Sequence, residues 1–171
     1  MVTSLELIWN GWRSGYVLAQ PSAGTAPELG SVFTRILATD LPDEETFIVH
    51  RGVLVFAILN AFPYTTGHLL VLPYREVAEL ELLTADETAE LWTTVTNGVR
   101  AVKAAYSPGG VNVGINLGRA AGGSIDDHLH VHVVPRWAGD GNFLASIANA
   151  RTLPEPLIDS AAKLRAEWPK P

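Results

Sequence analysis

The chain has 171 residues, of which 47% are hydrophobic and 18% are charged, and its formal net charge is −6. This composition predicts a folded chain with a sizeable core and excludes a disordered one. The negative charge argues against nonspecific binding to nucleic acid or acidic membranes. Because there is no cysteine, disulfides and thiolate metal sites are excluded.

The N-terminal residues 1–30 are expected to form an arm and a loop. A weak helical stripe in the first dozen residues is followed, from Val17, by a segment rich in alanine, proline, glycine and serine. The first six residues lack the basic region of a signal peptide, and the longest apolar run, from Gly52 to Leu59, is too short to span a bilayer. We therefore expect a soluble cytoplasmic protein that forms one domain over residues 1–171.

Residues 31–145 are the expected core of this domain, and their first half has the pattern of a short helix followed by strands. Arg51-Gly52 is predicted to make a tight hairpin, and Pro73 is predicted to end the third strand. In chain order, the pattern predicts a helix at Phe33–Leu37, a turn at Leu41–Asp43, and strands at Thr46–His50, Val53–Leu59 and His68–Leu72.

The second half of the core contains one long amphipathic helix. Thr84 and Glu87 have the spacing of a capping box, and the helix should run to about Tyr106. Its inner stripe comprises Leu91, Val95, Val99 and Val102. Further elements are expected at Val111–Asn116 (strand), Leu117–Ser124 (glycine-rich loop), His128–Val134 (strand) and, within the tail 146–171, Pro156–Glu167 (helix). The order β-β-β-α-β-β predicts an α+β fold, an antiparallel sheet with one long helix on a face.

Three of the five histidines, His128, His130 and His132, occupy alternate positions in the last predicted strand. Alternate side chains of a strand share a face, so the three imidazoles should line one side of the sheet, with the intervening apolar residues on the other. Their Cα atoms would lie roughly 6–7 Å apart. Because each buried ring nitrogen needs a partner, this face suits chemistry better than a core.

Three interpretations of the histidine strand are open from spacing alone. The imidazoles could bind zinc or iron, with Asp126 or Asp127 adding a carboxylate. One neutral imidazole could attack phosphorus while its neighbours orient it. The strand could also be a solvated surface. The preceding loop, Gly122-Gly123-Ser124, supplies backbone and hydroxyl donors that suit a phosphate rather than a metal.

The segment His128–Val134 fits the pattern His-φ-His-φ-His-φ-φ, in which φ is apolar, and it resembles the histidine triad (HIT) superfamily of nucleotide hydrolases and transferases. The resemblance covers residues 31–145. Within the superfamily, residues 122–137 are most similar to the actinobacterial diadenosine tetraphosphate phosphorylases. Matching segments are Phe33–Leu37, Ile58–Asn60, Gly67–Pro73 and Asn116–Trp137.

The resemblance implies that His130 is the nucleophile on the α-phosphorus and forms a nucleotidyl-histidine intermediate, which inorganic phosphate or water then attacks. It implies that His132 and His68 contact the phosphate and that His128 holds the ring of His130. The implied nucleotide-binding residues are Phe33, Ile36 and Ile58 around the purine, Asn60 on the ribose, Asn116, Gly123 and Ser124 on phosphate oxygens, and Trp137.

Some of these residues have alternative roles. Asn60 could cap a strand end, and Ile36 and Ile58 could be core residues. Arg119 and Arg136, the nearest basic residues, could reach distal phosphates or lie solvated on the surface.

The implied activity is phosphorolysis of diadenosine tetraphosphate to ADP and ATP, with an adenine nucleotide and inorganic phosphate as partners. The alternatives are hydrolysis of dinucleoside polyphosphates or adenosine phosphoramidates, a metal-dependent enzyme with three histidine ligands, and an inactive nucleotide-binding module. No cofactor is expected.

The resemblance also bears on zinc and on assembly. Many relatives bind a structural zinc with a Cys-x-x-Cys pair, but this chain has Ser31 and Thr34 there, so we expect no metal although His50 remains. A homodimer or higher oligomer is implied, formed through Thr84–Tyr106 and Val111–Asn116.

Overall fold

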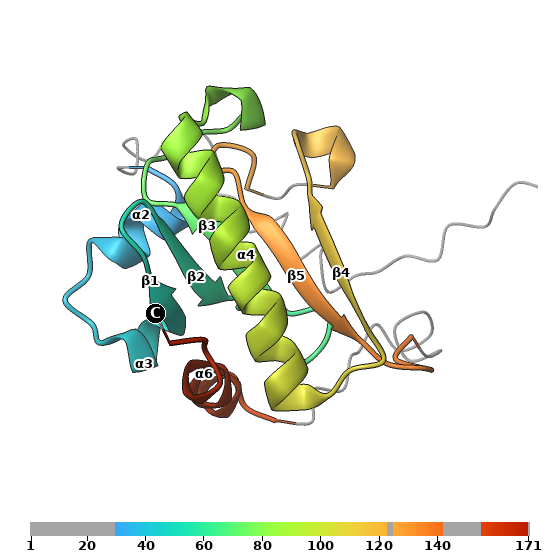
Figure 1. Ribbon diagram of the computed structural model, residues 1–171. Coiled ribbons are helices and arrows are strands. Elements are labelled where there is room, and N and C mark those ends of the chain that lie inside the picture. The colour runs from blue at the N-terminus through green and yellow to red at the C-terminus, as the bar shows by residue number, and fades with distance from the viewer. Residues whose placement is uncertain (1–29, 123–124, 142–154, 171) are drawn as a thin grey trace, which may run out of the picture.

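The computed structural model describes residues 30–122, 125–141 and 155–170, and their central feature is a five-stranded antiparallel sheet with strand order β1-β2-β3-β5-β4 (Figure 1). The predicted α+β class is confirmed. The strands are β1 (Ile48–Arg51), β2 (Val55–Leu59), β3 (Leu69–Pro73), β4 (Gly110–Ile115) and β5 (Val131–Arg136). The helices are α2 (Val32–Leu37), α3 (Asp43–Thr46), α4 (Ala85–Tyr106) and α6 (Leu157–Ala166), with 3₁₀ turns η1 (Leu80–Leu82) and η2 (Arg119–Ala121).

The long helix α4 starts as the sequence predicts and crosses one face of the sheet. The Thr84 side chain accepts the Glu87 backbone N–H, and the Glu87 carboxylate accepts the Thr84 N–H at 2.8 Å, which completes the capping box. Helix α6 packs beside α4 on the same face (Figure 1). The predicted long helix and C-terminal helix are therefore present with nearly the predicted bounds.

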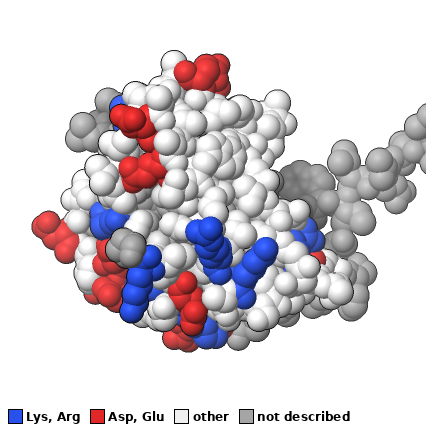
Figure 2. Space-filling model, viewed as in Figure 1, with Lys and Arg blue, Asp and Glu red and all other residues white. Residues whose placement is uncertain are grey.

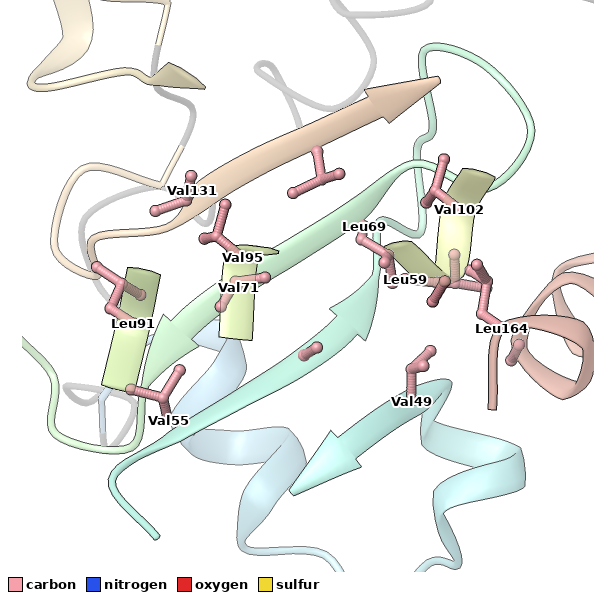
Figure 3. Close-up of a cluster of buried hydrophobic side chains, with 14 of the residues drawn as sticks. Val49, Val55, Leu59, Leu69, Val71, Leu91, Val95, Val102, Val131 and Leu164 are labelled. Carbon is pink, nitrogen blue, oxygen red and sulfur yellow. The ribbon is translucent and has the colours of Figure 1, made fainter. Parts of the chain in front are cut away.

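The larger core lies between this helical layer and the sheet (Figure 3). Leu91, Val95 and Val102 of α4 are buried, and Leu164 of α6 extends the same cluster. Fully burying a leucine or valine side chain contributes roughly 1.5–3 kcal/mol. Of the predicted stripe, only Val99 is less than fully buried.

A second, smaller core lies on the opposite face, where α2 packs on β2 and β3. Phe33 of α2 is buried against Ile58 and Leu70, two residues of the sheet. The short helix starts at Ser31, whose hydroxyl accepts the Thr34 N–H at 3.2 Å as an N-cap.

The β1–β2 connection is a tight hairpin, as predicted, but its two turn residues are Val53 and Leu54 rather than Arg51 and Gly52, because Arg51 pairs with Phe56 and the Gly52 N–H donates to the Val55 carbonyl at 2.8 Å. Residues 43–46 form the helical turn α3, and Phe47 ends it with φ 61°, so β1 begins at Ile48 rather than Thr46. Strand β2 begins at Val55, because the Glu90 carboxylate accepts the backbone N–H groups of Val53, Leu54 and Val55. Glu90 of α4 therefore holds the backbone donors of the two-residue turn.

The end of β3 agrees with the prediction, whereas the start of β5 does not. Pro73 is the last residue of β3, where it pairs with Val55. Strand β5 begins at Val131 rather than His128, because the Leu129 N–H donates to the Val77 carbonyl, beyond the end of β3.

The predicted alternation nevertheless holds on both sides of β5. Leu129, Val131 and Val133 are buried in the cluster that contacts α4. His132 pairs with Leu70 of β3 and with Gly114 of β4, on the face that carries α2. Within the described ranges, no helix is long and apolar enough to cross a bilayer. The predicted N-terminal arm lies outside the described residues.

Candidate active site

The ring of His130 is buried beside α2 with one nitrogen committed to the backbone. Its Nδ1 lies 2.8 Å from the carbonyl oxygen of His128. A carbonyl oxygen only accepts, so Nδ1 carries the proton and Nε2 keeps an unshared electron pair. Within the described residues, this Nε2 has no hydrogen-bond partner. The ring is therefore held in the tautomer that a histidine nucleophile requires.

His128 uses both ring nitrogens for hydrogen bonds inside the protein. Its Nε2 donates to the Pro73 carbonyl at 2.9 Å, so its Nδ1 must accept, and the donor is the hydroxyl of Ser31 at 2.7 Å. The side chain has no exposed surface. His128 can therefore support the nucleophile through its carbonyl group but cannot itself attack a substrate.

His68 and His132 form a second pair with fixed proton positions. The Tyr64 backbone N–H donates to His68 Nδ1 at 3.1 Å, so the proton of a neutral His68 is on Nε2. That nitrogen lies 3.0 Å from His132 Nδ1, which must accept, and the His132 proton is then on Nε2. The pair therefore fixes the proton of His132 on Nε2, the nitrogen that points away from His68.

Asn116, just after β4, borders this donor. Its side-chain amide nitrogen lies 3.3 Å from His132 Nε2. A half-turn of the amide would bring its oxygen to the proton on Nε2 and leave the NH₂ group for another acceptor. Asn116 therefore lies beside His132 in the described structure.

Aromatic rings pack around the four histidines. The His130 and His132 ring centroids are 4.9 Å apart, and the Phe33 ring is 5.6 Å from that of His130. The Tyr64 ring packs on His68 at 4.7 Å. Phe33 was predicted to lie at the site, whereas Tyr64 was not, because a turn tyrosine has no spacing that distinguishes it from a packing residue.

Burial sets the protonation state of His128 and His130. Desolvation lowers the pKa of His130 below its usual 6.5, and the field of His128 lowers it further, while the backbone hydrogen bond and Asp127 raise it. Desolvation also lowers the pKa of His128, which its hydrogen bond to Pro73 opposes. Both rings are therefore neutral near pH 7.

The acidic residues before the triad, and the two nearby arginines, are largely paired. Asp126 accepts a 2.6 Å hydrogen bond from Arg119 Nε, and this contact is the main reason why the pKa of Asp126 is lowered. The pair links η2 to the residues just before the triad. Arg136 instead contacts Asp140 and Asn112, so it is bound at the β4–β5 end of the sheet.

The remaining predicted nucleotide-binding residues fall into different places. Ile36 packs partly buried against the smaller core, and Ile58 is buried within it. Asn60 Oδ1 accepts the Phe62 N–H at 2.9 Å, which is the capping role that the sequence offered as an alternative to ribose binding. The Nδ2 atom of Asn60 lies 3.4 Å from His68 Nδ1. Gly123 and Ser124 lie outside the described residues.

Trp137 is not brought to the triad within this chain. It follows β5, whereas His130 precedes that strand, and six strand residues separate them by roughly 20 Å. Its ring packs edge-on against Tyr106 of α4, with 6.4 Å between centroids.

The residues at the position of the relatives' zinc site do not suit zinc. Ser31 Oγ and Thr34 Oγ1 bind His128 and Glu76, and His50 stacks on Trp168 with 4.8 Å between centroids. Across the ranges that the structure describes, no group of three histidine, cysteine, aspartate or glutamate side chains is arranged to hold a metal ion. The hydrogen bonds of His128 and His132 also keep the three triad imidazoles from converging on one point.

Comparison with known proteins identifies the family. Residues 42–139 match the family described as "HIT domain". The chain is 45% identical over 169 residues to a protein of Mycobacterium tuberculosis named "AP-4-A phosphorylase", covering 96% of this chain and 85% of that protein. This chain belongs to the HIT family. A "Bis(5'-nucleosyl)-tetraphosphatase [asymmetrical]" of Schizosaccharomyces pombe is 36% identical over 93 residues, or 54% of this chain and 50% of that protein.

Solved HIT structures share the fold. A zinc-bound histidine triad family protein from Mycobacterium smegmatis superposes with a TM-score of 0.66 at 29% identity, covering 81% of this chain and 92% of that one. A Hit-like protein from Bartonella henselae gives 0.67 at 26% identity, covering 84% and 99%. The HIT fold expected from the sequence is thus confirmed.

Proposed function

We propose that this HIT protein is a nucleotidyl transferase that cleaves diadenosine tetraphosphate with inorganic phosphate, giving ADP and ATP. The observation that carries the proposal is the state of His130, whose Nδ1 is held by a carbonyl while Nε2 keeps its electron pair. The printed name of the Mycobacterium tuberculosis relative, which matches nearly the whole chain, supports the choice of substrate.

In the first step, His130 Nε2 attacks the α-phosphorus. An N–P bond forms, the bond to the bridging oxygen breaks, and ATP leaves with that electron pair. The ring becomes a nucleotidyl-imidazolium that keeps its Nδ1 proton. The His128 carbonyl, 2.8 Å from Nδ1, stabilises the positive charge that develops there.

The neighbouring groups bind the phosphate. His132 Nε2–H, fixed by His68, donates to an oxygen of the α-phosphate as negative charge shifts during the displacement. Asn116 adds an amide donor beside it. We assign Gly123 and Ser124 to the same phosphate from the sequence.

In the second step, inorganic phosphate attacks the nucleotidyl group. The N–P bond breaks, its electron pair returns to His130 Nε2, and ADP is released. Two displacements through a covalent intermediate replace one direct attack between two anions. Attack by water instead would give AMP, which is the hydrolase alternative.

The nucleoside is proposed to bind on the α2 side of the histidines. Phe33 contacts both His128 and His130, so its ring borders the attacking nitrogen. Ile36 and Ile58 supply the apolar lining beside it, and Asn60, near His68, is proposed to bind the ribose.

The test is incubation with diadenosine tetraphosphate, with and without inorganic phosphate, followed by chromatography of the products. Formation of ADP and ATP that requires phosphate supports the proposal. Formation of AMP and ATP without phosphate would establish the hydrolase alternative, and no turnover in either condition would contradict both.

We further propose that the protein forms a homodimer through β4 and α4. Strand β4 is at the edge of the sheet, and Val113 on β4 and Trp92 on α4 are 43% and 44% exposed. An exposed sheet edge invites pairing with another strand. In Figure 2, charged side chains lie mainly along the left and lower parts of the view, and an uncharged area covers the middle of α4 and the surface to its right. Light scattering should give twice the 18.4 kDa chain mass.

A further inference from the structure

We propose that the hydroxyl of Ser31 is a positioning residue that connects helix α2 to the nucleophile His130 by way of His128. The proposal deepens the proposed function and rests on it for its kinetic consequences. The structural linkage itself can be tested without substrate.

The first step of the linkage is a buried contact between distant parts of the chain. Ser31 Oγ and His128 Nδ1 are 2.7 Å apart although 97 residues separate them, and the two side chains are 3% and 0% exposed. Because His128 Nε2 donates to the Pro73 carbonyl, Nδ1 can only accept, and the single hydroxyl proton of Ser31 must point at it. The Pro73 carbonyl therefore selects the tautomer of His128, and the Ser31 hydroxyl supplies the donor that this tautomer requires.

The second step joins this hydroxyl to α2. Its oxygen accepts the Thr34 N–H as the N-cap of the helix. One oxygen thus caps the helix that carries Phe33 and, at the same time, holds the first histidine of the triad.

Glu76 fixes the first turn of α2 from outside. Its Oε2 accepts the Ser31 backbone N–H at 2.7 Å and the Thr34 hydroxyl at 2.6 Å. The hydrogen bond from the Ser31 backbone is the main reason why the pKa of Glu76 is lowered, so the carboxylate is ionised at neutral pH. Glu76 therefore holds the backbone of the N-cap Ser31 and the side chain of Thr34 at the start of α2.

The last step reaches the reacting nitrogen. The carbonyl of His128 accepts the Nδ1 proton of His130, so any shift of His128 displaces the group that keeps the His130 electron pair on Nε2. The Phe33 ring touches both imidazoles, 5.5 Å from His128 and 5.6 Å from His130. Hydrogen bonds and packing thus stabilise the segment that contains Ser31 and Thr34, which stand where the resemblance implies a zinc-binding Cys-x-x-Cys pair in many relatives.

Ser31→Ala removes the donor and leaves His128 Nδ1 buried without that partner, which costs free energy and favours a shift of the ring. We expect kcat for diadenosine tetraphosphate to fall about tenfold to a hundredfold, since misplacing a reacting group by about 1 Å has effects of this size. KM should stay within about twofold. Thr39→Ala is the matched control, because Thr39 is an exposed hydroxyl residue just beyond α2 whose side chain donates to the Ile36 carbonyl.

Imidazole ¹⁵N spectra of the free protein give the readout that a merely structural role would not change. In the wild type and in Thr39→Ala, His128 and His130 should each show one protonated and one unprotonated nitrogen, with opposite assignments in the two rings. Ser31→Ala should change the nitrogen signals of both rings, and Ser31→Thr, which keeps the hydroxyl, should restore them.

Unchanged spectra together with unchanged kcat in Ser31→Ala would overturn the proposal. If Ser31→Ala does not fold, Glu76→Gln, a change at an exposed residue, provides the same test. This substitution should weaken the hydrogen bond from the Ser31 backbone N–H to residue 76, and it should therefore shift the His128 nitrogen signals and lower kcat. Unchanged His128 nitrogen signals in Glu76→Gln would also overturn the proposal. If the wild type does not cleave diadenosine tetraphosphate, only the proposed function fails, and the spectra still decide the linkage.

Discussion

His68 Nε2 donates to His132 Nδ1 across 3.0 Å, and this single hydrogen bond decides which nitrogen of His132 can bind a substrate phosphate. The Tyr64 N–H holds the other side of the His68 ring, so the direction of donation is set by a backbone group that can only donate. His68 therefore acts through His132 by fixing its proton, in addition to any contact of its own.

From the His68–His132 hydrogen bond we predict the effect of His68→Phe. The aromatic ring fills the buried space, but His132 loses its hydrogen-bond donor and its fixed tautomer. Loss of one aimed donor to the reacting phosphate should lower kcat about a hundredfold. Steady-state kinetics with diadenosine tetraphosphate measure this. His50→Phe is the matched control, since His50 stacks on Trp168 away from the triad, and an equal loss in both variants would contradict the assignment.

The pH dependence of the reaction follows from the burial of His130. The nucleophile must be unprotonated, and desolvation lowers its pKa below 6.5, so the active form persists to lower pH than for an exposed histidine. The acid limb of kcat/KM should therefore have its midpoint below 6.5. A pH–rate profile from mildly acidic to neutral conditions measures it, and a midpoint at or above 6.5 would contradict this account.

Glu87 predicts an acid-dependent loss of stability that is separate from the active site. Hydrogen bonds from Arg75 and from the Thr84 backbone lower the pKa of Glu87 from 4.5 to about 2. A carboxyl with a depressed folded pKa stabilises the fold above its unfolded pKa, and this contribution is lost as pH falls from 4.5 toward 2.

Glu87→Gln removes this ionisation while keeping the length of the side chain. The wild type should therefore lose more unfolding free energy than the variant between neutral pH and about pH 3.5, measured by urea denaturation. Asp86→Asn, the neighbouring charge change in the first turn of α4, is the control. Equal pH dependence in wild type and Glu87→Gln would show that the Arg75–Glu87 contact does not act in this way.

Periodicity and capping residues predicted most of the fold, because they act locally. Thr84 with Glu87 defined the start of α4, and the alternation after His128 predicted which side chains of β5 face the helix. The β1–β2 hairpin was predicted, but its turn was placed two residues too early, because its backbone donors bind Glu90, a residue 35 or more positions away that no local pattern reveals.

The predictions for the site divide in the same way: local patterns revealed some residues, and contacts between distant residues concealed others. The histidines were found by their spacing, since alternation places them on one face. The roles of Ser31 and Glu76 were not found, because a serine at a helix start has an adequate local explanation as an N-cap. Only the fold shows that its hydroxyl proton points at His128 and that the carboxylate of Glu76 lies beside it.

Trapping the covalent intermediate tests the central claim most directly. The protein is mixed with diadenosine tetraphosphate without phosphate, quenched in base to preserve a phosphorus–nitrogen bond, and analysed by peptide mass spectrometry. We predict one adenylyl group on His130, discharged to ADP when phosphate is added before quenching, and no adduct in His130→Asn. An adenylyl group on another residue, or turnover retained by His130→Asn, would contradict the account.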